Sequence, residues 1–322
     1  MKVKPQACRE IEVDLVATAT GDAEIAARGR VEDHIGFCAP CRDDYQRYRE
    51  IDGVVGTLRR APAGAAAASG ARERLESRLA NLRSRLMMYR VFPSPLGNIL
   101  IARSEHGVSL VEYLGERTGF KSSRLAQMAG VEAHEDGIEI EALYRDLLEY
   151  LHGKRTRLEW PLDLRLARSD FQRAVMKATV AVPYGAVASY AGIASDVGNR
   201  SAVRAVAQAL RWNPLPIVVP CHRIIGSSGL LTGYAGDKLS LKTRLLGLEG
   251  VPTLGAHHDP RVARATMYVR DRHEVEYCLP TCGSLSTRTL ADLTLYASRE
   301  RAESAGFAPC SACRPDLHPL SA

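Results

Sequence analysis

The tetrapeptide Pro220-Cys221-His222-Arg223 carries the side chains best suited to covalent chemistry in this chain of 322 residues. Cysteine attacks as its thiolate, and an adjacent histidine commonly removes the thiol proton, which has an unperturbed pKa of about 8.5. The preceding apolar run, residues 215–219, predicts a buried strand that ends at the mouth of a pocket. A cysteine that packs as a small hydrophobe beside a chance histidine is the alternative interpretation.

Short motifs surround this tetrapeptide over residues 171–250. In chain order they are Phe171-Gln172, Val182-Pro183-Tyr184-Gly185, Ser189-Tyr190, Arg204-Ala205-Val206, Asn213-Pro214, the tetrapeptide itself, Gly233-Tyr234-Ala235-Gly236, Leu245-Leu246 and Glu249-Gly250. This order resembles the active-site domain of the O6-alkylguanine-DNA alkyltransferases, also called methylated-DNA–protein-cysteine methyltransferases. The resemblance implies that Cys221 takes the alkyl group from guanine O6 by in-line displacement. The product is a thioether, so each protein molecule would repair one lesion.

The resemblance also implies the roles of four polar residues near the cysteine. His222 would take the thiol proton through a bridging water, and Glu249 would orient His222. Asn213 would stabilise the turn beneath the active site. Tyr190 would crowd the phosphate of the flipped nucleotide and donate a proton to the leaving guanine.

Residues 190–197 and 201–211 have apolar positions at helical spacing, and Gly198-Asn199 between them predicts a tight turn. Such a helix-turn-helix docks on a DNA groove, which by the resemblance is the minor groove. Because chemistry on a base requires the nucleotide to leave the stack, Arg204 would fill the gap that it leaves. The flipped base would be held by the segment Tyr234, Ala235 and Gly236. All of these roles of single residues come from the resemblance.

Charge is distributed unevenly along the chain, whose formal net charge is +6. Residues 171–250 hold nine Lys or Arg against three Asp or Glu, whereas residues 1–60 hold ten against eleven. The basic surplus therefore falls where DNA is expected. The sequence departs from the family pattern at Asp237, where the family usually has a second glycine. The stretch from there to Glu249 is also about one residue longer than is usual in the family. An acidic residue at the DNA-facing rim would repel phosphates, which leaves the alkyl-group range open.

Four residues near the N-terminus have the spacing of a zinc site. His34 and Cys38 are one helical turn apart, Cys41 follows, and Cys8 would complete a Cys3His set. Residues 5–55 resemble the zinc-binding fold of anti-sigma factors. The resemblance implies a sigma factor as a partner, although such a fold can also serve as a small interaction module. Three unligated thiols and a surface histidine are the alternative.

Near the C-terminus, Cys278 and Cys282 form one pair at zinc-site spacing, and Cys310 and Cys313 form another. With the surrounding residues 305–316 they resemble the metal-binding domain of the Ada adaptive-response proteins. The resemblance implies a bound zinc ion and, at Cys278, a possible second methyl acceptor for DNA phosphotriesters. The arginines usual in that family are absent beside the first pair, so a purely structural zinc site is the alternative.

The chain is therefore expected to be an α+β multidomain protein with two zinc ions, one per terminal module. The resemblance implies that the alkyltransferase part consists of an RNase H-like α/β subdomain and a helix-turn-helix, winged-helix-like domain. Its small N-terminal domain is indicated by a meander over residues 88–112 and a helix over residues 138–151. The expected parts are a helical zinc module (1–57), a linker and short helix (58–87), the two alkyltransferase domains (88–168 and 169–252), a linker (253–262) and a small α/β zinc module (263–322).

No secretory signal and no apolar run of about eighteen residues is evident, so we expect a cytoplasmic protein without a membrane span. The expected partner is double-stranded DNA that carries O6-alkylguanine, and the alkyl transfer itself needs no cofactor. Two other functions remain open. One is a regulator whose binding to a sigma factor depends on the alkylation of Cys221 or Cys278. The other is a Cys-His hydrolase, a function that would explain neither the helix-turn-helix nor Arg204.

Overall fold

The computed structural model describes residues 5–60, 65–117, 119–135, 138–236, 238–256 and 259–320. The chain divides into two compact units, residues 1–79 and residues 80–322. Asp237, which the sequence singled out as a departure from the family pattern, lies outside the described residues. Within the described part, no helix combines the length and the apolar character needed to cross a membrane.

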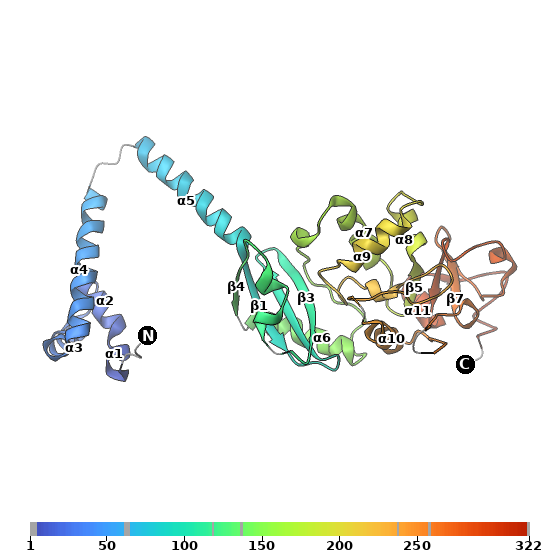
Figure 1. Cartoon of the computed structure of the whole chain (residues 1–322), viewed down its shortest axis with the longest axis horizontal. Helices are drawn as coiled ribbons and strands as arrows, with labels where there is room; N and C mark the ends of the chain where they lie inside the picture. The colour runs from blue at the N-terminus through green and yellow to red at the C-terminus, as the bar shows by residue number, and fades with distance from the viewer. Residues whose placement is uncertain are drawn as a thin grey trace. The chain divides into compact units, whose positions relative to one another are not determined.

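The first unit is helical, with a small core built around Leu15 and Val31. Its helices are α1 (Gln6–Glu10), α2 (Glu12–Thr20), α3 (Ile25–Phe37) and α4 (Ala39–Arg60) (Figure 1). Helix α5 (Ala65–Arg85) follows and crosses the boundary to the second unit. The sequence indicated a linker and a short helix here, whereas α5 is 21 residues long, because arginine, glutamate, leucine and alanine all favour helix.

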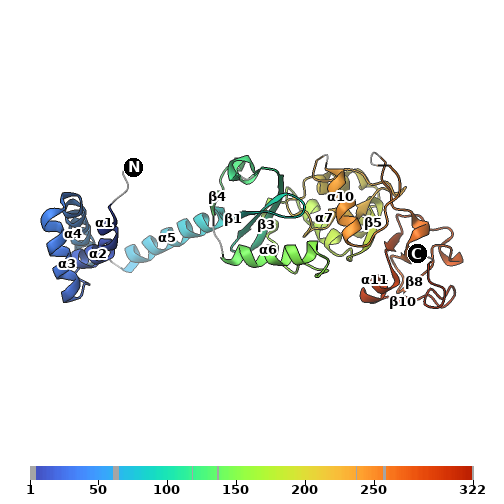
Figure 2. The same ribbon diagram turned by 90° about the horizontal axis from the view of Figure 1, so that it is seen from below.

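The second unit begins with a four-stranded sheet covered by a helix. Its strands are β1 (Leu86–Phe92), β2 (Asn98–Ser104), β3 (Gly107–Gly115) and β4 (Glu132–Glu135), in the spatial order β3-β2-β1-β4. The first three form the predicted antiparallel meander, and β4 pairs with β1 in parallel. Helix α6 (Ile138–Leu151), as predicted, packs against this sheet through Ile140 and Leu147 (Figure 2).

The domain around Cys221 contains the predicted helix-turn-helix. Its elements are α7 (Asp170–Val180), β5 (Ala186–Ser189), α8 (Tyr190–Asp196), α9 (Val203–Arg211), the 3-10 helix η4 (Cys221–Arg223), β6 (Ile224–Ile225) and α10 (Leu239–Leu248). The Ser189 hydroxyl accepts from the Gly192 N–H and so caps α8. Gly198, with φ of 77°, provides the left-handed turn between α8 and α9.

The apolar run 215–219 does not form the buried strand that the sequence predicted. It is a tight loop whose only regular pairing among the described residues is an isolated bridge between Pro216 and Val219. Ile217 has φ of 74°, a conformation that β-branched residues rarely adopt. The run is nevertheless buried, with Leu215 and Val219 both 0% exposed. A short apolar run indicates burial, but it cannot distinguish a strand from a packed loop.

The C-terminal module consists of β7 (Tyr268–Asp271), β8 (Glu276–Tyr277), β9 (Leu293–Tyr296), α11 (Arg299–Ser304) and β10 (Ala308–Pro309). Strands β8 and β10 pair with each other. Strands β7 and β9 join β5 and β6 in one sheet, in the order β6-β5-β9-β7. The segment expected as a linker, residues 253–262, also contributes, because Arg261 forms backbone bridges with Leu230 and Leu254. The C-terminal module is thus built onto the domain that contains Cys221.

Candidate active site and metal centres

Cys221 lies in the first turn of η4 and is 7% exposed. The Asn213 amide Nδ2 donates to the Cys221 Sγ at 3.2 Å and to the Val219 carbonyl at 3.0 Å. The Asn213 Oδ1 accepts from the Leu215 N–H at 2.9 Å. Asn213 therefore fastens both ends of the loop 215–219 and places one donor directly on the sulfur.

A buried ionic network lies next to Cys221. The Glu249 carboxylate, 1% exposed, is 2.6 Å from the His222 Nε2 and accepts from the Gly185 N–H at 3.0 Å. Arg223 donates to both carboxylate oxygens, from Nε to Oε2 at 2.9 Å and from Nη2 to Oε1 at 3.0 Å. The Tyr150 hydroxyl donates to the same Oε1. Such a fully paired carboxylate can remain charged inside the protein.

The network fixes the protonation of its members. Burial alone would raise the pKa of Glu249, but the charge of Arg223 and the hydrogen bonds outweigh burial and hold this pKa well below its usual value. Burial lowers the pKa of His222 despite the opposing pull of Glu249, so His222 is neutral near pH 7. Because Glu249 is ionised, the histidine proton is assigned to Nε2 from this hydrogen bond. The Nδ1 lone pair is then the basic position, and it has no partner among the described residues.

Burial also governs the groups around the sulfur. It raises the pKa of the Cys221 thiol, against the hydrogen bond from Asn213 and the charge of Lys242. The thiol is therefore protonated at rest and needs a base before it can attack. Burial likewise raises the pKa of Tyr190, which stays a phenol and can donate a proton.

Two hollows meet at Cys221. One, of about 260 Å³, is also lined by Tyr190, Tyr234 and Ala235. The other, of about 320 Å³, is also lined by Tyr113 and Gly236. Ala235 adopts a left-handed φ of 42°, a conformation uncommon for a residue other than glycine and often found at functional sites. The structure therefore brings the expected base-binding segment 234–236 to the cysteine.

Helix α9 has two distinct faces. Val206, Ala209 and Leu210 are buried against the domain core. Arg204 and the small residues Ala205 and Ala207 are exposed on the opposite face. Small side chains on this face permit close approach to a groove, and Arg204 is a long, charged side chain beside them.

Three residues with a place in this site were not given a role from the sequence. Arg223 and Tyr150 bind Glu249, and Lys242 is 0% exposed and donates to the Ile224 and Thr232 carbonyls at 2.5 and 3.0 Å. The position of Arg223 inside the tetrapeptide was a usable signal. The sequence contains no comparable signal for Tyr150, because no local pattern predicts that α6 lies next to Glu249.

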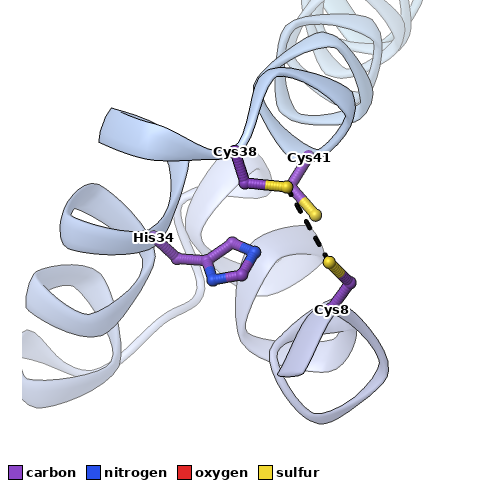
Figure 3. Close-up of side chains that lie close together, drawn as sticks. All are labelled: Cys8, His34, Cys38 and Cys41. Atoms are coloured by element: carbon purple, nitrogen blue, oxygen red, sulfur yellow. Dashed lines mark hydrogen bonds between the residues drawn. The ribbon is translucent and has the colours of Figure 1, made fainter. Parts of the chain in front are cut away.

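The predicted N-terminal zinc ligands lie together (Figure 3). Donor atoms of Cys8, His34, Cys38 and Cys41 are all within 4.8 Å of one another, and the Cys8 and Cys38 sulfurs are 3.8 Å apart. The His34 Nε2 is buried without a hydrogen-bond partner among the described residues, as expected of an atom that binds a metal. Three thiols and one imidazole form a common structural zinc set, so these residues fit zinc.

Loss of this zinc will unfold the first unit. The double variant Cys38→Ser/Cys41→Ser removes two of four ligands that link α1, α3 and α4, and the small core cannot replace them. We expect the zinc content, measured by atomic absorption, to fall from two ions to one per chain, with rapid amide exchange in α2 and α3. His106→Asn, at an exposed histidine in the second unit, is the control. Two zinc ions in the double variant would contradict this site.

The predicted C-terminal ligands also lie together. Donor atoms of Cys278, Cys282, Cys310 and Cys313 are within 4.8 Å of one another, and the Leu279 N–H donates to the Cys313 Sγ at 3.3 Å. Four thiols form a closed structural set for zinc, and backbone N–H groups commonly support such sulfurs. Cys278, the possible methyl acceptor, is 6% exposed, whereas Cys313 is the more exposed of the four. The chain thus has two zinc sites.

Three family models match consecutive parts of the chain. Residues 87–164 match the ribonuclease-like domain of 6-O-methylguanine DNA methyltransferase, and residues 170–251 match the DNA binding domain of the same enzyme. Residues 256–316 match the metal binding domain of Ada. These matches agree with the architecture described for the second unit.

Individual proteins are similar over the same region. The constitutive methylated-DNA–protein-cysteine methyltransferase of Bacillus subtilis is 37% identical over 163 residues, which are 51% of this chain and 95% of that protein. The enzyme of the same name from Methanosarcina acetivorans is 37% identical over 51% of this chain and 99% of its own length. The crystal structure of the Mycobacterium tuberculosis O6-methylguanine methyltransferase is 37% identical, covers 51% of this chain and 92% of that chain, and has a TM-score of 0.44. The chain therefore belongs to the methylated-DNA–protein-cysteine methyltransferases, DNA repair enzymes that transfer a methyl group from DNA to a cysteine of the protein.

Proposed function

We propose that this chain repairs O6-alkylguanine in double-stranded DNA by moving the alkyl group irreversibly onto Cys221. The observation that carries the proposal is a buried thiol directly followed in the chain by a neutral histidine, whose Nε2 is hydrogen-bonded to an ionised carboxylate. This is the nucleophile, base and orienting group of covalent catalysis. No other cysteine in the described residues lies outside the two zinc clusters.

The proton leaves the Cys221 thiol for the His222 Nδ1 through a bridging water. The His222 Nε2–H stays on Glu249, whose charge stabilises the imidazolium that forms. The thiolate then attacks the alkyl carbon, so a carbon–sulfur bond forms as the carbon–O6 bond breaks. The leaving guanine takes a proton from the Tyr190 hydroxyl. A thioether has no thiolate to regenerate, which ends the activity of that molecule.

The lesion reaches the sulfur after the nucleotide has left the duplex. Helix α9 lies against the minor groove through its exposed alanines, and Arg204 fills the space left in the base stack. The flipped base occupies the hollow of about 260 Å³ between Tyr190 and the segment 234–236. The alkyl substituent then faces the point where this hollow meets the second one, at Cys221.

Intact-mass measurement after incubation with a duplex containing O6-methylguanine tests this proposal. The expected result is one added methyl group per molecule, mapped by peptide analysis to Cys221. An unmethylated duplex is the control. A folded, zinc-loaded protein that gains no methyl group, or gains it elsewhere, would refute the assignment of Cys221.

Arg204→Ala is expected to slow repair of duplex DNA by about tenfold to a hundredfold, with little effect on free O6-benzylguanine. Only the duplex requires the gap to be filled, and a few kcal/mol of lost stacking must be offset there. Single-turnover rates with both substrates measure the difference. Arg173→Ala, at a partly exposed arginine of α7 that pairs with Asp170 on the same helix, is the control. Equal losses on both substrates would argue against the intercalating role.

The sigma-factor partner implied for residues 5–55 remains a prediction. Its support is a shallow apolar hollow on α4 lined by Ile51, Val54 and Val55, of which Ile51 is 58% and Val54 60% exposed. If this surface binds a sigma factor, the factor should co-purify with the chain, and Ile51→Glu should release it. Identical recovery with the variant would remove this partner.

A further inference from the structure

The C-terminal zinc module and the alkyltransferase domain share one sheet. Strand β9 of the module pairs antiparallel with β5, through Ala186 with Tyr296 and Ala188 with Thr294. On its other edge, β5 pairs with β6, the strand that follows Cys221, His222 and Arg223. Strand β5 is therefore held between the active-site segment and the zinc module. In each of the three residue pairs that join β5 to β9, both residues are buried.

Ser189 connects the paired strand β5 to Tyr190. Ser189 is the last residue of β5, is 1% exposed, and immediately precedes Tyr190. Its hydroxyl accepts from the Gly192 N–H and donates to the Leu290 carbonyl of the zinc module at 2.8 Å. The cap of the helix that begins with Tyr190 is thus anchored to the zinc module.

An arginine of the module holds the other end of the same helix. Arg272 pairs with Asp196, the last residue of α8, and its side chain is only 11% exposed. Its guanidinium lies against Gly192, where an added Cβ would be 2.2 Å from Nη1. Since no side chain fits between them, Arg272 and α8 are in close contact. Both ends of α8 therefore depend on the module.

The zinc cluster connects directly to these contacts. The backbone of Cys278 exchanges two hydrogen bonds with Val269 on β7, at 2.7 and 2.9 Å. Strand β7 pairs with β9, and β9 pairs with β5. A module of about sixty residues has a small core and depends on its metal to stay folded. The path from the cluster to Tyr190 thus runs through the bridge between Cys278 and Val269, the paired strands β7, β9 and β5, and Ser189.

We infer that the C-terminal zinc module is a positioning element for alkyl transfer at Cys221, through strand β5, Ser189 and the contact of Arg272 with α8. Zinc at Cys278, Cys282, Cys310 and Cys313 thereby fixes the position of Tyr190. This inference rests on the proposed function of Cys221, and it adds a role for the module that needs no methyl transfer to Cys278. Residues 263–320 act on the reaction without touching the substrate.

The test uses the full chain with and without zinc in the C-terminal site. The variant Cys282→Ser/Cys310→Ser should keep only the N-terminal zinc, lose amide protection over residues 186–189, and transfer methyl groups from duplex about tenfold or more slowly. Unchanged protection of β5 together with an unchanged transfer rate would overturn the inference.

A second set of variants leaves the zinc ligands intact. Arg272→Ala should keep both zinc ions but slow transfer and raise amide exchange in α8, whereas Arg272→Lys, which keeps the charge beside Asp196, should restore most of the rate. Arg261→Ala is the control, because this exposed arginine pairs only with Asp259 among the described side chains. A rate for Arg272→Ala equal to that of the control would count against the positioning role. If the unmodified protein transfers no methyl group at all, the proposed function fails, and amide protection of β5 still decides whether zinc holds the strand.

Discussion

Replacing Cys221 by alanine is expected to abolish alkyl transfer to this protein while leaving duplex binding intact. In the proposed mechanism the sulfur forms the new bond, whereas docking depends on α9 and its exposed face. The thiol makes one side-chain hydrogen bond, from Asn213, so its loss should cost about 1 kcal/mol of folding free energy. Intact mass after incubation with the O6-methylguanine duplex measures transfer, and fluorescence anisotropy measures binding.

Cys221→Ser provides a sharper version of the same experiment. The hydroxyl keeps the hydrogen bond from Asn213, but it ionises far less readily than a thiol and is a poor nucleophile. Transfer should therefore remain undetectable although the packing is preserved. Any methyl group found on either variant would move the acceptor role to another residue, with Cys278 the first to examine.

Glu249→Gln is expected to reduce both stability and transfer. The amide cannot neutralise Arg223, which is 6% exposed, and an uncompensated buried charge costs about 3 to 5 kcal/mol. The amide also no longer stabilises the imidazolium of His222, so transfer should fall by on the order of a hundredfold or more. Urea unfolding and single-turnover rates measure the two effects. Glu300→Gln, at a carboxylate 69% exposed on α11, is the control.

The pH dependence of the free energy of unfolding tests whether Glu249 stabilises the fold through its negative charge. The pKa of Glu249 is depressed in the folded protein, so its stabilisation is fully present above the unfolded value of about 4.3 and is lost as the pH falls further. His222 also has a lowered pKa, and its protonation disfavours the fold below about pH 6.5. The original protein should therefore lose stability steadily from neutral pH towards pH 3. The Glu249→Gln variant should not show the part of this loss that occurs below about pH 4.3. If the variant and the original protein lost stability identically with pH, Glu249 would not be ionised in the fold.

Local sequence patterns predicted much of this molecule. The helical spacing over residues 138–151 and 190–211 gave the correct helices, because apolar periodicity directly reflects which face is buried. The two zinc clusters were predictable because metal ligands are few and closely spaced in the chain. The sequence of residues 215–219 predicts a strand, because its apolar character indicates burial but nothing in it indicates the left-handed conformation of Ile217.

Long-range contacts were beyond the reach of the sequence. Tyr150 and Glu249 are 99 positions apart, and no local pattern brings their oxygen atoms together. The sheet shared by β5 and β9 was missed for the same reason, because strand pairing between distant segments depends on the completed fold. Residues 253–262 read as a linker in the sequence, although Leu254 and Arg261 within this range form backbone bridges.

The hydroxyl of Tyr150 has a consequence for chimeric proteins. It comes from α6, yet it donates to the carboxylate of Glu249 and accepts from the Arg223 Nη2 at 3.2 Å. A hybrid joined between residues 168 and 169 would inherit the phenol from one parent and the carboxylate with its arginine from the other. If the first parent lacked the phenol, Arg223 and Glu249 would keep their charges but lose a shared partner inside the core. A recombined alkyltransferase should therefore keep its buried charges fully paired only if its two halves match at this oxygen atom.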